Sequence, residues 1–125
     1  MKNIPDVSKA EFEILRVIWR IGESSIREVH DNLASSFSWA YSTTKTTMDR
    51  MVKKGLLKRS EFHGVFIYHA LINRPQGLFR WVKFIADRVL EMDYVDVVAL
   101  FAKNKKLNSD EIAELKNLLE NDTNE

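Results

Sequence analysis

The chain has 125 residues, 45% of them hydrophobic and 30% charged, and a formal net charge of +1 at pH 7. These values are typical of one small soluble domain, or of one domain with an appendage. The chain contains no cysteine, which excludes disulfides, thiol redox switches and cysteine-based metal sites. It shows neither a signal-peptide-like start nor an apolar run of membrane-spanning length, so we expect a cytoplasmic protein without a membrane partner.

The small net charge conceals an uneven distribution of charged residues. Between Lys45 and Arg59 there are six cations and one anion, Asp49, whereas the stretch from Leu107 to the C-terminus has one cation and six anions. A cluster of cations is typical of a nucleic-acid-binding surface, and here the acidic tail cancels it in the sum.

Two capped helices are expected at the start of the chain. Ser8 followed by Glu11 has the spacing of a capping box, and Gly22 ends this first helix. Ser25 followed by Glu28 opens a second helix in the same way. The residues expected on the inner sides of these two helices are Phe12, Leu15, Val17, Ile18, Trp19, Ile21, Ile26, Val29, His30 and Leu33.

The segment from Ser42 to Gly55 predicts a third helix with two different faces. Ser42 is expected to cap its start, and Gly55 suits the left-handed conformation beyond its end. One face carries Thr44, Thr47, Met48, Met51 and Val52, and the other carries Thr43, Lys45, Thr46, Asp49, Arg50 and Lys53. The second face begins with short hydroxyls and ends with cations, as in helices that read the DNA major groove. Taken alone, such a face is more often a solvated surface.

After Gly55 the apolar period changes from 3.6 to 2. Residues 56–60 and 65–70 read as two strands joined by a turn at His63 and Gly64. Three helices followed by a basic hairpin is the element order of a winged helix. We therefore predict a mainly α fold with a small β-hairpin wing, a winged helix-turn-helix domain over residues 1–72.

Residues 73–125 are expected to form a second, helical region. Asn73 and Pro75 suit a helix start, and helices are predicted over residues 75–92, from Tyr94 to Phe101, and after a capping box of Asn108 and Glu111. Three short amphipathic helices are too few to bury their own apolar faces, so we expect them to need a partner surface. The winged helix and a second chain are both candidates.

Three stretches resemble the BlaI/MecI/CopY family of bacterial repressors. Residues 39–56 carry a Trp before the helix, Thr-x-x-Thr within it and Arg-x-x-x-Lys-Gly at its end. The opening stretch from Ser8 to Trp19 is similar to the family's first helix, and that from Leu107 to Leu115 to the start of its last. The resemblance implies a winged-helix N-terminal domain, a C-terminal helical dimerisation region and operator binding as a homodimer.

The chain departs from the family pattern in three respects. It lacks the C-terminal cysteine cluster of the copper-responsive branch. The Asn-Phe bond that a sensor protease cuts in the penicillinase branch corresponds here to Leu100-Phe101, the candidate cleavage site, and its Asn is missing. The recognition helix has Thr44 and Thr47 where the family has larger apolar groups, and Ser42 and Lys45 where basic residues are common. We therefore expect an operator different from the penicillinase operators.

The leading hypothesis is a transcriptional repressor that binds a palindromic double-stranded DNA operator as a homodimer. The residues expected to read bases are Ser42, Thr43, Lys45 and Thr46, and those expected to hold phosphates are Arg50, Lys53, Lys54, Lys58 and Arg59. The residues expected in the dimer interface are Leu78, Trp81, Ile85, Val89, Val97, Phe101, Ile112, Leu115, Leu118 and Leu119.

Two hypotheses from other classes remain open. A winged-helix protein-interaction module would use the basic patch on an acidic protein and ignore DNA sequence. An enzyme would have to rely on His30, His63 and His69 with scattered carboxylates and hydroxyls, because no phosphate loop, nucleophile elbow or metal-ligand pair is present. We therefore expect no catalytic activity, no cofactor and no metal.

Overall fold

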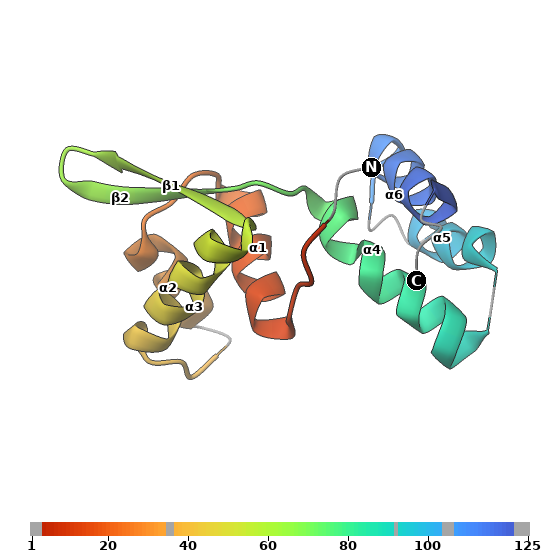
Figure 1. The fold of residues 1–125 in the computed structure, drawn as a ribbon, viewed down its shortest axis with the longest axis horizontal. Coiled ribbons are helices and arrows are strands. Elements are labelled where there is room, and N and C mark those ends of the chain that lie inside the picture. The colour runs from red at the N-terminus through yellow and green to blue at the C-terminus, as the bar shows by residue number, and fades with distance from the viewer. Residues whose placement is uncertain (1–3, 35–36, 92, 104–106, 122–125) are drawn as a thin grey trace. The chain divides into compact units, whose positions relative to one another are not determined.

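The computed structural model describes residues 4–34, 37–91, 93–103 and 107–121, and confirms the mainly helical winged-helix fold (Figure 1). The elements in chain order are α1 (Lys9–Ile21), α2 (Ile26–Ala34), α3 (Tyr41–Lys54), β1 (Leu57–Phe62), β2 (Val65–Ala70), α4 (Arg74–Phe84), the π-helical segment η1 (Ile85–Leu90), α5 (Tyr94–Lys103) and α6 (Ser109–Asn121). The chain divides into two compact units, Met1–Asn73 and Arg74–Glu125. No helix in the described ranges is long and apolar enough to cross a membrane.

The three predicted capping boxes are present. In each box the glutamate lies three positions after the cap residue. Its backbone N–H donates to the cap side chain, and its carboxylate accepts from the backbone N–H of the cap residue. These reciprocal bonds join Ser8 to Glu11, Ser25 to Glu28, and Asn108 to Glu111, at 2.8–3.2 Å. The starts of α1, α2 and α6 are thus fixed by residues three positions apart.

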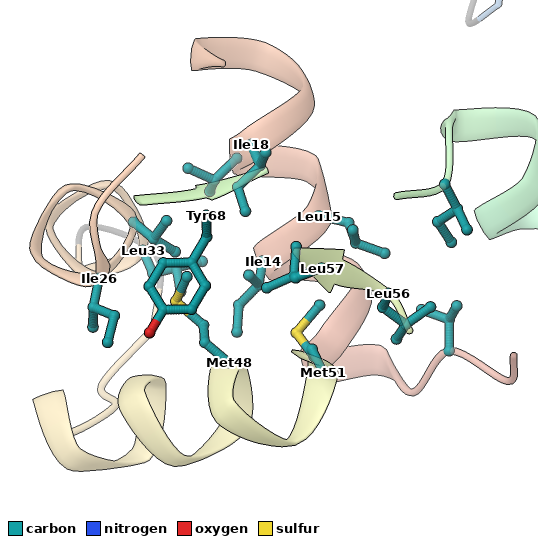
Figure 2. Close-up of a cluster of buried hydrophobic side chains, with 14 residues drawn as sticks. Ile14, Leu15, Ile18, Ile26, Leu33, Met48, Met51, Leu56, Leu57 and Tyr68 are labelled. Atoms are coloured by element: carbon teal, nitrogen blue, oxygen red, sulfur yellow. The ribbon is translucent and has the colours of Figure 1, made fainter. Parts of the chain in front are cut away.

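The core of the first unit lies between helices α1–α3 and the inner end of the hairpin. Figure 2 shows buried side chains from all five elements converging. The central members are Ile14, Leu15 and Ile18 of α1, Leu33 of α2, Met48 and Met51 of α3, Leu57 of β1 and Tyr68 of β2. The prediction that Ile21 faces this core is wrong, because it lies in the last turn of α1 and is 40% exposed.

The hairpin is attached to the helices through its inner half. Its strands are antiparallel, with Leu57 opposite Ala70 and Phe62 opposite Val65, and the turn places His63 and Gly64 at positive φ. Ser24 extends this sheet by one bridge, because its N–H donates to the Tyr68 carbonyl at 3.0 Å and its carbonyl accepts from the Tyr68 N–H at 2.8 Å. The outer half of the hairpin projects beyond the helices of this unit (Figure 1).

The second unit packs α6 against α4 and α5. Lys83 of α4, Asp87 of η1 and Tyr94 of α5 join these elements through mutual hydrogen bonds of 3.2 Å. Residues buried within the single chain include Phe79, Val82, Val97, Val98, Leu115 and Leu119. Several large apolar side chains of the same unit, among them Phe84, Ile85 and Val89, are nevertheless exposed. The expectation that these helices need a partner surface therefore stays a prediction.

Tyr68 carries a buried polar atom that costs stability. Its side chain is fully buried, and within the described ranges its hydroxyl is the buried side-chain polar atom without a hydrogen-bond partner. Tyr68→Phe should therefore raise the free energy of unfolding by about 0.5–1 kcal/mol, since an unsatisfied buried hydroxyl is removed while the ring is kept. Urea unfolding followed by circular dichroism measures this change. A loss of stability on Tyr68→Phe would contradict the assignment and indicate a buried water on the hydroxyl.

Candidate nucleic-acid interface

The N-cap of helix α3 lies two residues earlier than its hydroxyl pattern predicts. Ala40 is the N-cap, with extended backbone (φ −72°, ψ 154°) and no side-chain capping bond. The prediction that Ser42 caps the helix is therefore wrong, because Ser42 already lies within its first turn. At the other end Gly55 adopts φ 87° and its N–H donates to the carbonyl of Val52, as predicted for a glycine that ends a helix.

The buried face of α3 includes two hydroxyls whose hydrogen bonds are satisfied. Thr44 and Thr47 lie on this face with Met48 and Met51, as predicted. The Thr44 Oγ1 lies 2.9 Å from His30 Nδ1 on α2, and the Thr47 Oγ1 donates to the Thr43 carbonyl at 2.7 Å. His30 is therefore a half-buried structural residue that joins α2 to α3.

The opposite face of α3 brings the predicted base-reading residues together. Ser42, Thr43, Lys45 and Thr46 are all exposed on the first two turns. A shallow surface hollow is lined by Ser42, Thr43, Thr46, Thr47 and Arg50. Hydroxyl donors and acceptors with a guanidinium at one end can hydrogen-bond base edges and a phosphate.

The predicted phosphate-binding cations differ in their exposure and in their distance from a carboxylate. Lys53 on α3 and Lys58 and Arg59 on β1 are exposed, and the Arg59 guanidinium stacks over the Phe66 ring at 4.3 Å. Lys54 instead points to a carboxylate, with its Nζ 2.8 Å from Glu11 Oε1. Arg50 is intermediate, because it is exposed while its Nε lies 3.7 Å from Glu11 Oε2.

Glu11 has a second role here that the sequence did not predict. Besides capping α1, it pairs with cations of α3. Its side chain is 2% exposed and connects the start of α1 to the end of α3. Burial opposes ionisation, but the hydrogen bonds from Lys54 and from the Ser8 backbone more than offset it, so the pKa of Glu11 is lowered. Glu11 is therefore a charged anchor for the last turn of the recognition helix.

The predicted interface residues of the second unit differ in exposure. Val97, Leu115 and Leu119 are buried within the single chain, Leu78, Trp81, Ile112 and Leu118 are half-buried, and Ile85 and Val89 are exposed. The other large apolar side chains exposed on this unit are Phe84, Val95 and Leu100. Leu100 and Phe101 lie within α5, and the Phe101 side chain is outside the described part of the structure. In the described ranges no group of three or more His, Asp or Glu side chains could hold a metal ion.

The three helices, the hairpin and the polar face of α3 define a winged helix-turn-helix protein. Residues 7–121 match the family model described as Penicillinase repressor, and the chain belongs to this family. The penicillinase repressor of Bacillus licheniformis is 31% identical over 124 residues, which cover 99% of this chain and 97% of that protein. The methicillin resistance regulatory protein MecI of Staphylococcus aureus (strain N315) is 26% identical over 114 residues, 91% of this chain and 93% of that one.

Two solved structures agree with the fold of the first unit. One is the solution structure of the DNA-binding domain of the repressor BlaI, and the other is the monomeric form of Bacillus licheniformis BlaI in complex with the blaP half-operator. Each has a TM-score of 0.54 and 34% identity, and covers 61% of this chain and 93% of its own.

Removal of the buried charge at Glu11 should loosen the end of α3. Glu11→Gln leaves Lys54 without its carboxylate, and we expect a loss of about 1–2 kcal/mol in the free energy of unfolding at pH 7. Because the pKa of Glu11 is lower in the folded protein, its ionised carboxylate stabilises the folded state fully at pH values above the ordinary glutamate pKa of about 4.3. This stabilisation is lost as the pH falls through the pKa of the folded protein. The difference between parent and variant should therefore shrink below about pH 4.

Urea unfolding at pH 7, 5 and 3.5 measures this difference in stability. Glu13→Gln is a matched control, because Glu13 on the same helix pairs only with the exposed Arg16 at 3.0 Å among the contacts described. If the difference in unfolding free energy between the parent and Glu11→Gln were constant over this pH range, Glu11 would not be an ionic anchor.

Proposed function

We propose that this protein is a sequence-specific DNA-binding repressor of transcription. The observation that carries the proposal is the exposed face of α3, where Ser42, Thr43, Lys45 and Thr46 are displayed together beside the exposed cations of α3 and β1. A helix enters the major groove, where hydroxyls and ammonium groups distinguish base pairs by their edges. The BlaI complex with a half-operator supports a duplex DNA partner for this surface.

In this mechanism the protein binds without chemistry. The first two turns of α3 approach base edges, and Arg50 and Lys53 on α3 and Lys58 and Arg59 on the wing hold phosphates. Lys54 contributes less to DNA than these four, because Glu11 holds its ammonium. Family membership as a penicillinase repressor agrees with a binding function and gives no support to an enzyme.

The repressor acts as a homodimer on a palindromic operator. One recognition helix makes few base contacts, and joining two half-site contacts raises affinity by roughly 10²–10⁴. The exposed apolar side chains of the second unit, among them Ile85 and Val89, supply a surface for the partner copy. A sensor protease that cuts at Leu100-Phe101 would remove α6, which packs against α4 and α5. Loss of the dimer by this or another route would remove the joined contact and release the operator.

Selection of bound sequences from random duplex DNA tests the function directly. The intact chain should enrich one palindromic sequence. If the chain instead bound DNA without sequence preference and captured an acidic protein through the same face, it would be a protein-interaction module. This result would overturn the proposed repressor function.

Base reading and phosphate contact should be separable by mutation. Thr46→Ala should reduce the binding free energy on the operator by roughly 1–3 kcal/mol and relax the preference at one base pair. Binding to arbitrary duplex DNA should be unaffected. Lys53→Gln should weaken binding to the operator and to arbitrary duplex by similar factors. It should also lower by about one the slope of log affinity against log salt concentration. Fluorescence titrations over a salt series measure both effects. Identical selected sites for parent and Thr46→Ala would exclude Thr46 as a reader.

The proposed dimer makes a prediction about Val89. This side chain is 60% exposed, so Val89→Glu should leave the single chain folded but place a charge in the apolar interface, and the variant should be monomeric. Sedimentation velocity at operator-binding concentrations measures the state. Leu71→Glu is a matched control, because Leu71 is also exposed (48%) but lies in the first unit. A parent chain that sediments as a monomer would contradict the dimer.

A further inference from the structure

Asp49 places a negative charge in the middle of the cationic face. It is the one acidic residue between Lys45 and Arg59, and its side chain is 35% exposed. Its Oδ2 lies 3.1 Å from the Lys45 Nζ on the same helix, and its Oδ1 lies 4.0 Å from an Arg59 guanidinium nitrogen on the wing. One carboxylate thus contacts a predicted base-reading cation and a predicted phosphate-binding cation.

Stability does not account for this carboxylate. Exposed ion pairs contribute little to folding, since solvent screens them and the side chains lose freedom. The Lys45 and Arg59 side chains are 57% and 42% exposed. The other acidic partner of this surface, Glu11, is buried and serves as an anchor, so the two acids have different roles.

The second contact of Arg59 strengthens the argument for positioning. Its guanidinium stacks over the Phe66 ring at 4.3 Å while it faces Asp49 at 4.0 Å, so an aromatic ring and a carboxylate both restrain it. Lys45 is restrained by an i,i+4 pair on α3. Both cations therefore already have a partner within the protein when a ligand arrives.

We propose that Asp49 is a specificity-determining positioning residue that lowers affinity for arbitrary DNA more than affinity for the operator; this rests on the proposed function. A phosphate that approaches Lys45 or Arg59 must displace the carboxylate and is repelled by it. In arbitrary duplex DNA these cations meet only phosphates, so the whole cost of displacing the Asp49 carboxylate lowers the affinity. At the operator the Lys45 ammonium, held in one position, donates to a base-edge acceptor, which offsets the cost.

Asp49→Asn tests the proposal, because it keeps the shape of the side chain and removes its charge. The full chain is titrated onto its selected operator and onto an arbitrary duplex of equal length over a salt series. Affinity for the arbitrary duplex should rise roughly three- to tenfold, with a salt slope steeper by about one, while affinity for the operator should rise less or fall. The ratio of the two affinities should therefore drop several-fold.

Asp31→Asn is the matched control for loss of one negative charge from the first unit. Asp31 lies on α2 and pairs with Arg27 of the same helix at 3.8 Å, and it is not one of the proposed DNA-contacting residues. It should leave the specificity ratio unchanged. Combining Lys45→Gln with Asp49→Asn should also lower specificity by less than the sum of the two single effects, because the two residues act as a pair.

The outcomes separate this inference from the function on which it rests. Equal rises on both duplexes, or no change, would overturn the role of Asp49 while the parent remained a specific repressor. A parent chain without any preference for a selected sequence would overturn the proposed function, and the role of Asp49 with it.

Discussion

The packing of one face of α3 is the constraint on which the reading surface depends. Met48 and Met51 are fully buried among side chains of α1 and the hairpin, including Ile14 and Tyr68 (Figure 2). Because a helix is rigid, fixing one face fixes the direction in which the opposite face displays Thr43 to Thr46. A reading site on such an element is held more precisely than one on a loop.

Two carboxylates shape this surface, and burial separates their effects. Glu11 is 2% exposed, so a ligand that drew Lys54 away would leave a buried carboxylate without its shortest ion pair, which is costly. Asp49 is 35% exposed, so under the proposed function a phosphate that approaches from solvent would compete with it for Lys45 and Arg59. A count of positive residues along α3 therefore overstates the charge available to DNA. The geometry leaves Lys53 and Lys58 as the cations least engaged by these two carboxylates.

The features predicted well from the sequence depend on residues close together in the chain. The capping boxes, the Gly55 stop and the two faces of α3 each arise from spacings of a few residues, and all are present. The hairpin and its turn at His63 and Gly64 follow in the same way from a change of period and a glycine.

The wrong cap at Ser42 is a local error, but two other features that were missed depend on distant parts of the chain. Glu11 and Lys54 are 43 positions apart, so no local pattern connects the capping glutamate to the recognition helix. The inner packing of α6 against α4 and α5 likewise decides that Leu115 and Leu119 are buried within one chain. Their helical spacing alone could not distinguish a core position from an interface position, because both require an apolar face.

Under the proposed function, dimerisation and release of the operator both involve the second unit. Leu100 is 48% exposed and belongs to the same unit as Ile85 and Val89, the exposed apolar residues assigned to the partner copy. The Leu100-Phe101 bond lies within helix α5, and a protease must open that helix locally before it can cut. Association of two copies through this unit adds contacts that local opening must break, so it lowers the population of the open form. In the proposed mechanism a paired repressor would therefore be a poorer protease substrate than a free chain.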